Sequence, residues 1–468
     1  MKNKDIWRCR FHLTPPTGWM NDPNGVCQYQ GTYHVFFQYA PGYPAEDTKA
    51  WGHYTSPDLV HWNFEGTALY PDTVYDRDGA YSGSACIGHD TMELYYTGNV
   101  KQEGPHDYTH SGRESNTLRV TSRDGRHFSE KQCVLRNPDY PAGYTCHIRD
   151  PKVWKEENRY KMVLGGRRND DSGAVLIYES EDGIRWSYSC DITSNRPFGF
   201  MWECPDIFEL DGRRFLACCP QGIPAEDYRF QNYHLSGYFP FDASANTESG
   251  TFVERTGIDE TRFREWDHGF DFYAPQTFVD EHGRRILIGW AGLPDMPYQE
   301  PGLAQQNWIY QLTLPRVVTC RNGILFQYPV PELDQLHGRE YQPDSRDWFS
   351  VGLSCFDWQL TPEDACTEFI IHITKNITFS YNGTVLSLTF YGKIGAGRTQ
   401  RNVLCSHVEH IRILADCSIL EFYINYGEIV MTTRFFPEHE ETGLRVEGAF
   451  TRNQLWDMNK TVVQLHTD

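Results

Sequence analysis

Three acidic residues that lie far apart in the sequence each stand just ahead of a proline. Asp22 and Asp150 directly precede the proline, and Glu203 lies two positions before it. If folding brought the three carboxylates together, repulsion would spread their pKa values, and one acid could stay protonated near neutrality. A protonated acid beside an ionised one can cleave a glycosidic bond, because one protonates the leaving oxygen while the other attacks the anomeric carbon or activates water.

The residues around these acids favour a sugar over a metal ion. Asp and Glu also bind Ca²⁺, so a cation is the obvious competitor for three converging carboxylates. Aromatic side chains accompany the acids, and flat apolar surfaces suit a sugar ring better than a hydrated ion. They are Trp19, Trp51, Tyr81, Trp202, Tyr273 and Trp290. We therefore expect a small-molecule sugar as partner, no metal and no cofactor.

A repeat in the first two thirds of the chain indicates how the acids are positioned. Short segments rich in aromatic and branched residues recur roughly every 60 residues, at 33–39, 92–98, 160–166, 213–219 and 284–290. No helical periodicity accompanies them, so the pattern predicts an all-β fold in which residues 1–328 form a five-bladed β-propeller. An irregular sandwich of hairpins is the alternative, and the regular spacing disfavours it.

The prolines connect this repeat to the three acids. Four of the repeats carry a proline seven or eight residues ahead of their turn, namely Pro23, Pro151, Pro205 and Pro275. Proline suits an irregular strand segment because it has no N–H to donate to the ladder. Equivalent positions of successive blades lie on a ring around the propeller axis, so we expect Asp22, Asp150 and Glu203 to converge at one end of the central channel.

The last third of the chain is expected to form a second domain. Prolines and a short amphipathic turn at 329–341 predict a linker, and residues 342–468 contain alternating strand patterns such as 367–374 and 384–392. This pattern predicts a β-sandwich packed on the propeller. Asp416, Ser418 and Glu421 form a conspicuous polar set, for which we expect turn and surface positions.

Composition excludes several other classes of protein. The formal net charge of −20 argues against nucleic acids and anionic membranes as partners. No apolar stretch approaches the 18 residues of a membrane span, and residues 1–11 carry charges throughout, which predicts a cytoplasmic location. The 14 cysteines are scattered without paired spacing, so we expect reduced and mostly buried thiols.

Eight short motifs resemble glycoside hydrolase family 32, which contains invertases, fructan hydrolases and sucrose-6-phosphate hydrolases. They stand in the family's order, as WMNDPNG (19–25), FFQYAP (36–41), WGH (51–53), YSGSA (81–85), IRDPKV (148–153), MWECPD (201–206), DFYAPQ (271–276) and GW (289–290). Residues 411–437 also resemble the family's second domain. The resemblance implies a five-bladed propeller followed by a β-sandwich, and a second domain that supports stability or a homodimer.

The resemblance also implies a role for each residue of the site. Asp22 would be the nucleophile that forms a fructosyl-enzyme, Glu203 the acid and base, and Asp150 the group that binds fructose hydroxyls and stabilises the transition state. The subsite would be lined by Asn21, Gln38, Trp51, Tyr81, Ser82, Arg149, Cys204, Tyr273 and Trp290. We expect Arg149 to keep Asp150 ionised, and Trp202 with the nearby acids to raise the pKa of Glu203.

The expected activity is retaining hydrolysis that releases β-D-fructofuranosyl units from sucrose, sucrose 6-phosphate or short fructo-oligosaccharides. A fructosyltransferase or fructan-specific hydrolase with the same site is the alternative, and a non-catalytic sugar-binding propeller is disfavoured by the three intact acids. Two positions depart from the family pattern. Tyr81 replaces a common phenylalanine, and the loop before Trp51 offers only Tyr43 as an aromatic wall. A phosphorylated substrate would need a cation such as Lys49, Arg113 or Arg264.

Overall fold

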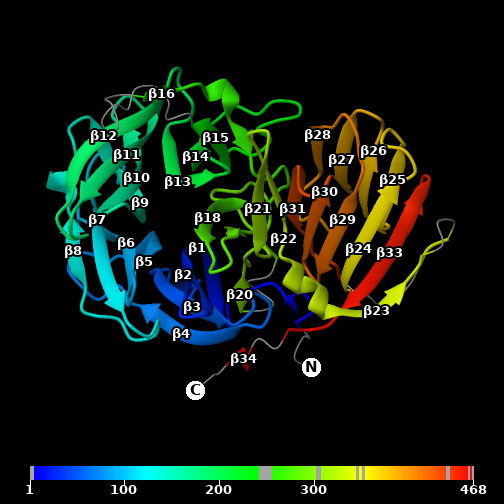
Figure 1. Ribbon diagram of the computed structural model, residues 1–468, viewed down its shortest axis with the longest axis horizontal. Helices are drawn as coiled ribbons and strands as arrows, with labels where there is room; N and C mark the ends of the chain where they lie inside the picture. The colour runs from blue at the N-terminus through cyan, green and yellow to red at the C-terminus, as the bar shows by residue number, and fades with distance from the viewer. Residues whose placement is uncertain are drawn as a thin grey trace.

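The computed structural model describes residues 5–241, 256–301, 307–343, 347–349, 354–438, 443–461 and 464–465. Almost all regular structure in this part of the chain is β-strand, with three short 3₁₀ helices, η1 (Asn137–Asp139), η2 (Glu260–Arg262) and η3 (Pro331–Leu336). Figure 1 shows a ring of sheets beside a second pair of sheets. Within the described residues, no helix has both the length and the apolar character needed to cross a membrane.

Five sheets make up the ring, and we number them as blades in chain order. Blade I contains β1 (Gly18–Tyr29), β2 (Thr32–Ala40), β3 (Ala50–Ser56), β4 (Asn63–Leu69), β20 (Trp308–Ile309) and β34 (Gln464–Leu465). Blade II contains β5 (Ala80–Ile87), β6 (Met92–Lys101), β7 (Arg113–Ser122) and β8 (Gln132–Leu135). Blade III contains β9 (Tyr144–Glu156), β10 (Arg159–Arg168), β11 (Gly173–Ser180), β12 (Ser187–Ser194) and β16 (Thr256–Ile258).

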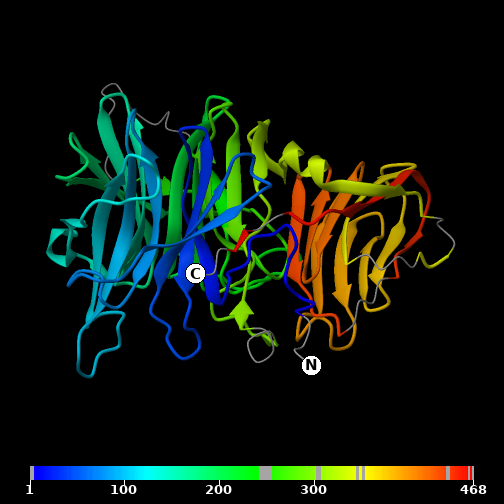
Figure 2. The same cartoon turned by 90° about the horizontal axis from the view of Figure 1, so that it is seen from below.

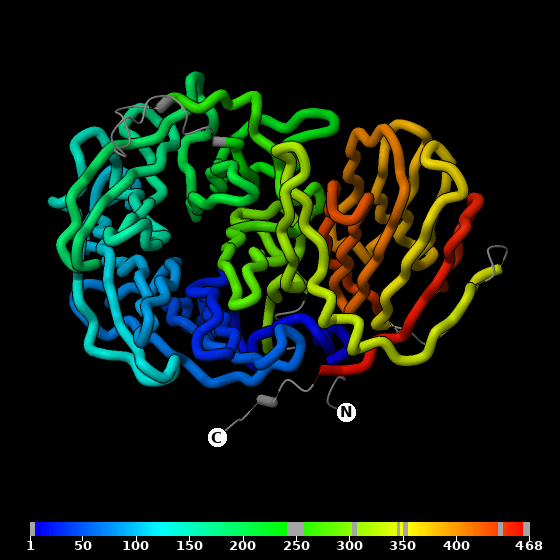
Figure 3. Tube along the Cα trace, in the orientation of Figure 1, coloured from blue at the N-terminus to red at the C-terminus, as the bar shows by residue number. Residues whose placement is uncertain are grey.

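The ring continues with two four-stranded sheets. Blade IV contains β13 (Met201–Leu210), β14 (Arg213–Gln221), β15 (Gly237–Phe241) and β17 (Arg264–Glu265). Blade V contains β18 (Tyr273–Val279), β19 (Arg285–Trp290), β21 (Arg316–Arg321) and β22 (Ile324–Pro329). The innermost strands β1, β5, β9, β13 and β18 touch one another in that order, and β18 touches β1. This closed ring, traced in Figure 3, confirms the predicted five-bladed propeller.

The repeat found in the sequence is the second strand of every blade. The five aromatic segments coincide with β2, β6, β10, β14 and β19, and the buried side chains of these strands fill the contacts between blades. Aromatic and β-branched residues suit this position because both faces of the strand are covered.

A bulge interrupts the innermost strand of every blade at the same place. In four blades the register with the second strand shifts after one residue of the innermost strand, namely Met20 in β1, Ala80 in β5, Glu203 in β13 and Tyr273 in β18. In blade III the shift lies opposite Val163–Gly165, so that Asp150 and Pro151 of β9 have no register partner in β10. In three blades the residue before the proline has a positive φ, 64° at Asp150, 47° at Cys204 and 47° at Ala274. A left-handed backbone ahead of proline is strained for a residue with a Cβ, and strain of this kind concentrates at functional sites.

Two further sheets pack face to face as a β-sandwich, in agreement with the sequence prediction. One contains β23 (His337–Tyr341), β24 (Cys355–Pro362), β29 (Ile411–Asp416), β30 (Ile419–Ile424), β31 (Ile429–Arg434) and β33 (Phe450–Met458). The other contains β25 (Phe369–Thr374), β26 (Ile377–Tyr381), β27 (Val385–Phe390), β28 (Gln400–Leu404) and β32 (Arg445–Glu447). Trp358, Phe379 and Phe422 belong to the apolar core between them. Figures 1 and 2 show the sandwich beside blade V.

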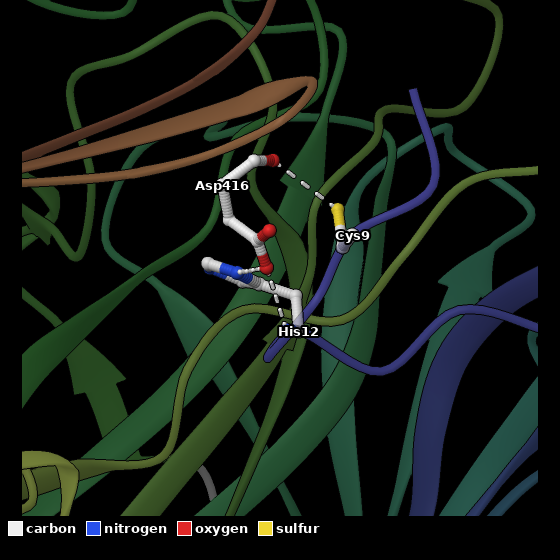
Figure 4. Close-up of side chains that lie close together, drawn as sticks. All are labelled: Cys9, His12 and Asp416. Carbon is white, nitrogen blue, oxygen red and sulfur yellow. Dashed lines mark hydrogen bonds and ion pairs between the residues drawn. The ribbon is translucent and has the colours of Figure 1, made fainter. Parts of the chain in front are cut away.

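Buried charges join the sandwich to the propeller. The fully buried Arg316 of blade V pairs with Glu421 at 3.1 Å and with Asp267 at 3.3 Å. Asp416 accepts hydrogen bonds from the backbone N–H groups of residues 10, 11 and 12, at 2.7, 2.9 and 2.8 Å. Its carboxylate also contacts the His12 ring, as Figure 4 shows. The surface positions predicted for Asp416, Ser418 and Glu421 are therefore wrong, because their polar partners come from distant segments that cover them.

Candidate active site

The structure brings the three predicted acids together at the bulges of β1, β9 and β13. The backbone N–H of Cys204 donates to Oδ2 of Asp150 at 2.9 Å. The Cys204 Sγ lies 3.6 Å from Oδ2 of Asp150 and 3.9 Å from Oδ2 of Asp22. Glu203 is the neighbour of Cys204 in β13, so one bulge links the acids of blades I, III and IV.

Asp22 is held by neutral hydrogen-bond donors. The Ser82 hydroxyl donates to Oδ2 of Asp22 at 2.5 Å, and the Asn21 amide donates to Oδ1 at 3.1 Å. Gln38 orients both donors, because its amide N–H donates to Ser82 at 2.6 Å and its carbonyl accepts from Asn21 at 2.9 Å. Burial raises the pKa of Asp22, while the Ser82 and Asn21 hydrogen bonds oppose the shift. Among the described residues, no cation forms an ion pair with Asp22.

Glu203 is held by four donors. Arg149 donates two hydrogen bonds to Oε1, from Nε at 2.9 Å and from Nη2 at 2.6 Å. The Gln221 amide and the Tyr273 hydroxyl donate to Oε2 at 2.6 and 2.7 Å. The Glu203 side chain keeps 14% of its surface exposed, so a substrate can reach it.

This pairing overturns two expectations about proton affinity. Burial by itself raises the pKa of Glu203, but the charge of Arg149 and the hydrogen bonds from Tyr273 and Arg149 outweigh it and lower the pKa. Asp150 shows the reverse, because burial and the charge of Glu203 raise its pKa to about 7 although Arg149 opposes the shift. Arg149 therefore ionises Glu203 rather than Asp150, since its guanidinium extends toward blade IV.

The Trp202 side chain faces away from the Glu203 carboxylate. Successive residues of a strand point to opposite faces, and the Trp202 ring is fully buried, 5.6 Å from the Phe239 ring. Its indole N–H donates to the Phe198 carbonyl. The expected rise in the pKa of Glu203 is wrong, because Arg149 and Tyr273 lower that pKa.

The other predicted subsite residues surround the acids in different ways. Tyr273 is buried against Glu203, and its register partner Trp290 is buried in the same cluster. Trp51 is fully buried and donates its indole N–H to the Tyr81 carbonyl at 3.0 Å. It therefore holds the backbone of Tyr81 in place rather than lining the site itself. Tyr81 itself is partly exposed.

The sequence prediction missed the contact of Gln221 with Glu203 but named Tyr43. Gln221, at the end of β14, is the register partner of Met201 and reaches Glu203 across the blade. Extending the repeat segment 213–219 by two residues would have included it. Tyr43 packs on Trp19 with ring centroids 4.9 Å apart, and it thereby forms an aromatic pair at the edge of blade I.

Clusters with the composition of a metal site lie elsewhere in the part of the chain that the structure describes. They are Cys9 with His12 and Asp416, Cys355 with Asp416 and Cys417, and Asp334 with His337 and Asp357. The first is drawn in Figure 4, where hydrogen bonds within the protein already occupy the Asp416 carboxylate. Asp22, Asp150 and Glu203 do not form such a cluster.

Comparisons with known proteins agree on one family. Residues 12–329 match the N-terminal domain, and residues 375–464 the C-terminal domain, of the glycosyl hydrolases family 32. A sucrose-6-phosphate hydrolase of Bacillus subtilis is 37% identical over 94% of this chain and 92% of its own length. A raffinose invertase of Escherichia coli is 34% identical over 97% of this chain and 95% of its own length.

Solved structures give the same result. The sucrose-6-phosphate hydrolase of Lactobacillus gasseri superposes with a TM-score of 0.85 at 27% identity, covering 98% of this chain and 95% of that one. A β-fructofuranosidase of Bombyx mori, a mutant of which was solved in complex with sucrose, superposes with a TM-score of 0.80 at 26% identity, covering 99% and 96%.

Proposed function

This chain belongs to glycosyl hydrolase family 32, and we propose that it is a retaining β-fructofuranosidase that hydrolyses sucrose or its 6-phosphate. The observation that carries the proposal is the convergence of two unlike carboxylates at the bulges of β1 and β13. Asp22 is ringed by neutral donors, and Glu203 is linked to a cation and two further donors. Retaining cleavage needs two carboxylates in unlike roles, a nucleophile and an acid that carries a proton.

The reaction proceeds in two displacements. The Asp22 carboxylate attacks the anomeric carbon of the fructosyl unit, the glycosidic C–O bond breaks, and Glu203 gives its proton to the departing glucose oxygen. Glu203, now ionised, takes a proton from a water molecule that attacks the same carbon and releases Asp22. Configuration at the anomeric carbon is retained because it inverts twice.

The proton that Glu203 donates comes from the Asp150–Glu203 pair. Without substrate, the raised pKa of Asp150, about 7, favours the proton on Asp150, while Arg149 lowers the pKa of Glu203 and favours its ionised form. Bound fructose hydroxyls would donate to Asp150 and favour its charged form. The glycosidic oxygen only accepts hydrogen bonds, so it favours protonated Glu203. Substrate binding would thereby move the proton to the group that uses it.

Two substitutions test this assignment. We expect Glu203→Gln and Asp22→Asn each to abolish glucose release from sucrose while circular dichroism stays like that of the wild type. Proton NMR of the fructose first released by the wild type should give the β anomer before mutarotation. Substantial activity in either variant, or first release of the α anomer, would contradict the mechanism.

Several expectations from the sequence stay predictions. The division into a propeller at 1–328, a linker at 329–341 and a sandwich at 342–468 is one, although η3 and β23 lie within the linker range. A cytoplasmic location and a homodimer are others. Limited proteolysis would test the division, and sedimentation equilibrium would test the dimer.

A further inference from the structure

A cavity of about 690 Å³ lies where the propeller meets the sandwich. Its walls come from blade IV, from the turn between β21 and β22 of blade V, and from β28 and the turn before β31 in the sandwich. The Gln231 side chain fastens the two domains beside it, because it donates to the Asn402 carbonyl at 2.6 Å and accepts from the Asn402 N–H at 3.0 Å. None of the described residues that line the cavity belongs to the candidate active site. A hollow of this size can hold a small organic molecule.

Four arginines line this cavity, although the net charge of the chain is −20. They are Arg213, Arg229, Arg262 and Arg264. Arg213 and Arg264 are exposed, and neither guanidinium has a hydrogen bond or an ion pair with the described residues. The Arg213 guanidinium lies over Gly323 in the turn of blade V. A hollow lined by charges of one sign concentrates ions of the opposite sign, so this cavity attracts anions.

Two carboxylates also line the cavity, and each is hydrogen-bonded elsewhere. Both oxygens of Glu265 accept the backbone N–H of Phe230 at 3.1 Å, and burial raises the pKa of Glu265. Glu428 accepts from the Asn425 amide at 3.1 Å. In the part of the chain that the structure describes, neither carboxylate pairs with either of the two unpaired arginines. The wall therefore keeps a surplus of positive charge.

A buried donor in the same wall also lacks a partner. Trp266 lines the cavity, is only 2% exposed, and its indole N–H has no hydrogen-bond acceptor among the described residues. Its ring lies 4.7 Å from that of Tyr238, whose hydroxyl is already engaged by the Leu325 N–H at 2.9 Å. A buried N–H without an acceptor costs free energy, and an indole nitrogen can only donate. The partner that Trp266 lacks is therefore an acceptor, as the charge of the cavity also requires.

We propose that this cavity binds an organic phosphate, at a site separate from the one that cleaves the sugar. The unpartnered groups of its wall, Arg213, Arg264 and Trp266, are all donors, and phosphate oxygens accept such bonds in pairs from a planar guanidinium. Apolar surface for the rest of the molecule comes from three aromatic side chains, Tyr228, Tyr238 and Phe263. A nucleotide and a sugar bisphosphate share this chemistry. Because the ligand touches both domains, its binding stabilises the folded protein.

The test measures binding of ATP and of fructose 1,6-bisphosphate to the full-length protein by titration calorimetry and thermal unfolding. We expect at least one of them to bind, and to raise Tm by about 2 °C or more at about a hundredfold excess over its Kd. Arg213→Gln and Arg264→Gln should each weaken this binding about tenfold to a hundredfold, and Arg213→Lys should bind with intermediate affinity. Arg185→Gln, the matched control at an exposed arginine that pairs with Asp182, should bind like the wild type.

Kinetics separate this site from the candidate active site. Arg213→Gln and Arg264→Gln should keep the wild-type kcat/KM for sucrose, and the bound phosphate should not compete with sucrose. Binding of ATP alone would identify the ligand as a nucleotide, and binding of fructose 1,6-bisphosphate alone as a sugar phosphate. The proposal is overturned if neither probe binds, if both Gln variants keep the wild-type affinity, if the probe competes with sucrose, or if inorganic pyrophosphate binds as tightly as the organic probe.

Discussion

Replacing Arg149 by glutamine should move the alkaline limb of the pH–rate profile to higher pH. In the wild type the Asp150–Glu203 pair holds one proton and loses it near the raised pKa of Asp150, about 7, which leaves no acid for the leaving group. Removing the cation makes ionised carboxylates less favourable, so the pair keeps its proton to higher pH. The limb belongs to the pair and not to one residue.

The size of the shift follows from the contact between Arg149 and Glu203. Two unit charges about 4 Å apart attract by about 4 kcal/mol at an effective dielectric constant of about 20. Hydrogen bonds to charged groups contribute about 1.5–3 kcal/mol net. At about 1.4 kcal/mol per pKa unit, and with 12% of Arg149 still exposed to water, we expect an upward shift of about one to two units.

The assay is kcat/KM for sucrose against pH, because this ratio reports the pKa values of the free enzyme. Arg149→Lys keeps a positive charge and should shift the limb less than Arg149→Gln. Arg185→Gln removes an exposed arginine of blade III that pairs with Asp182, and its profile should match the wild type. An alkaline limb that stays in place or moves down in Arg149→Gln would refute the proposed proton arrangement.

Three further substitutions test other parts of the structure. Because burial raises the pKa of Asp22 above its unfolded value, the ionised residue destabilises the fold as pH rises through that window; Asp22→Asn should therefore melt at the wild-type temperature or higher at pH 7, and a lower Tm by circular dichroism would contradict this. Gln221→Leu removes the 2.6 Å hydrogen bond to Glu203 and should lower kcat/KM for sucrose about tenfold, whereas wild-type kinetics would show that the bond is dispensable. Arg316→Met removes the buried guanidinium that pairs with Glu421 and Asp267 and should lower the free energy of unfolding by about 3–5 kcal/mol; a change below about 1 kcal/mol in urea denaturation would count against the junction described above.

The sequence predicted the ring and its acids because both depend on a local pattern. The aromatic second strands and the prolines recur with one spacing, and equivalent places in a propeller meet at the axis. The direction of Arg149 could not be predicted in this way. It depends on the bulge and the positive φ at Asp150, which interrupt the regular alternation of side chains between the two faces of β9. A bulge is defined only by how β9 pairs with β10, and the sequence does not show that pairing.

The polar residues at the domain junction show a second limit. Asp416 and Glu421 have the composition of a surface turn, and only their partners His12 and Arg316 reveal that they are buried. Those partners lie outside the repeat pattern and far away in the chain. Charged residues are predicted to be exposed when their partners are unknown. The sequence does not show which charged residues will pair in the fold.

The hydrogen bonds of Asp416 to residues 10–12 have a consequence for biosynthesis. Arg10 is synthesised 406 residues before Asp416, whose carboxylate binds the Arg10 backbone N–H. Domains fold as they emerge from the ribosome. Blade I can form its hairpins early, yet residues 10–12 lack the carboxylate that binds their backbone until β29 is complete. Residues 10–12 are therefore among the last to reach their final contacts, and they fasten the propeller to the sandwich once both have folded.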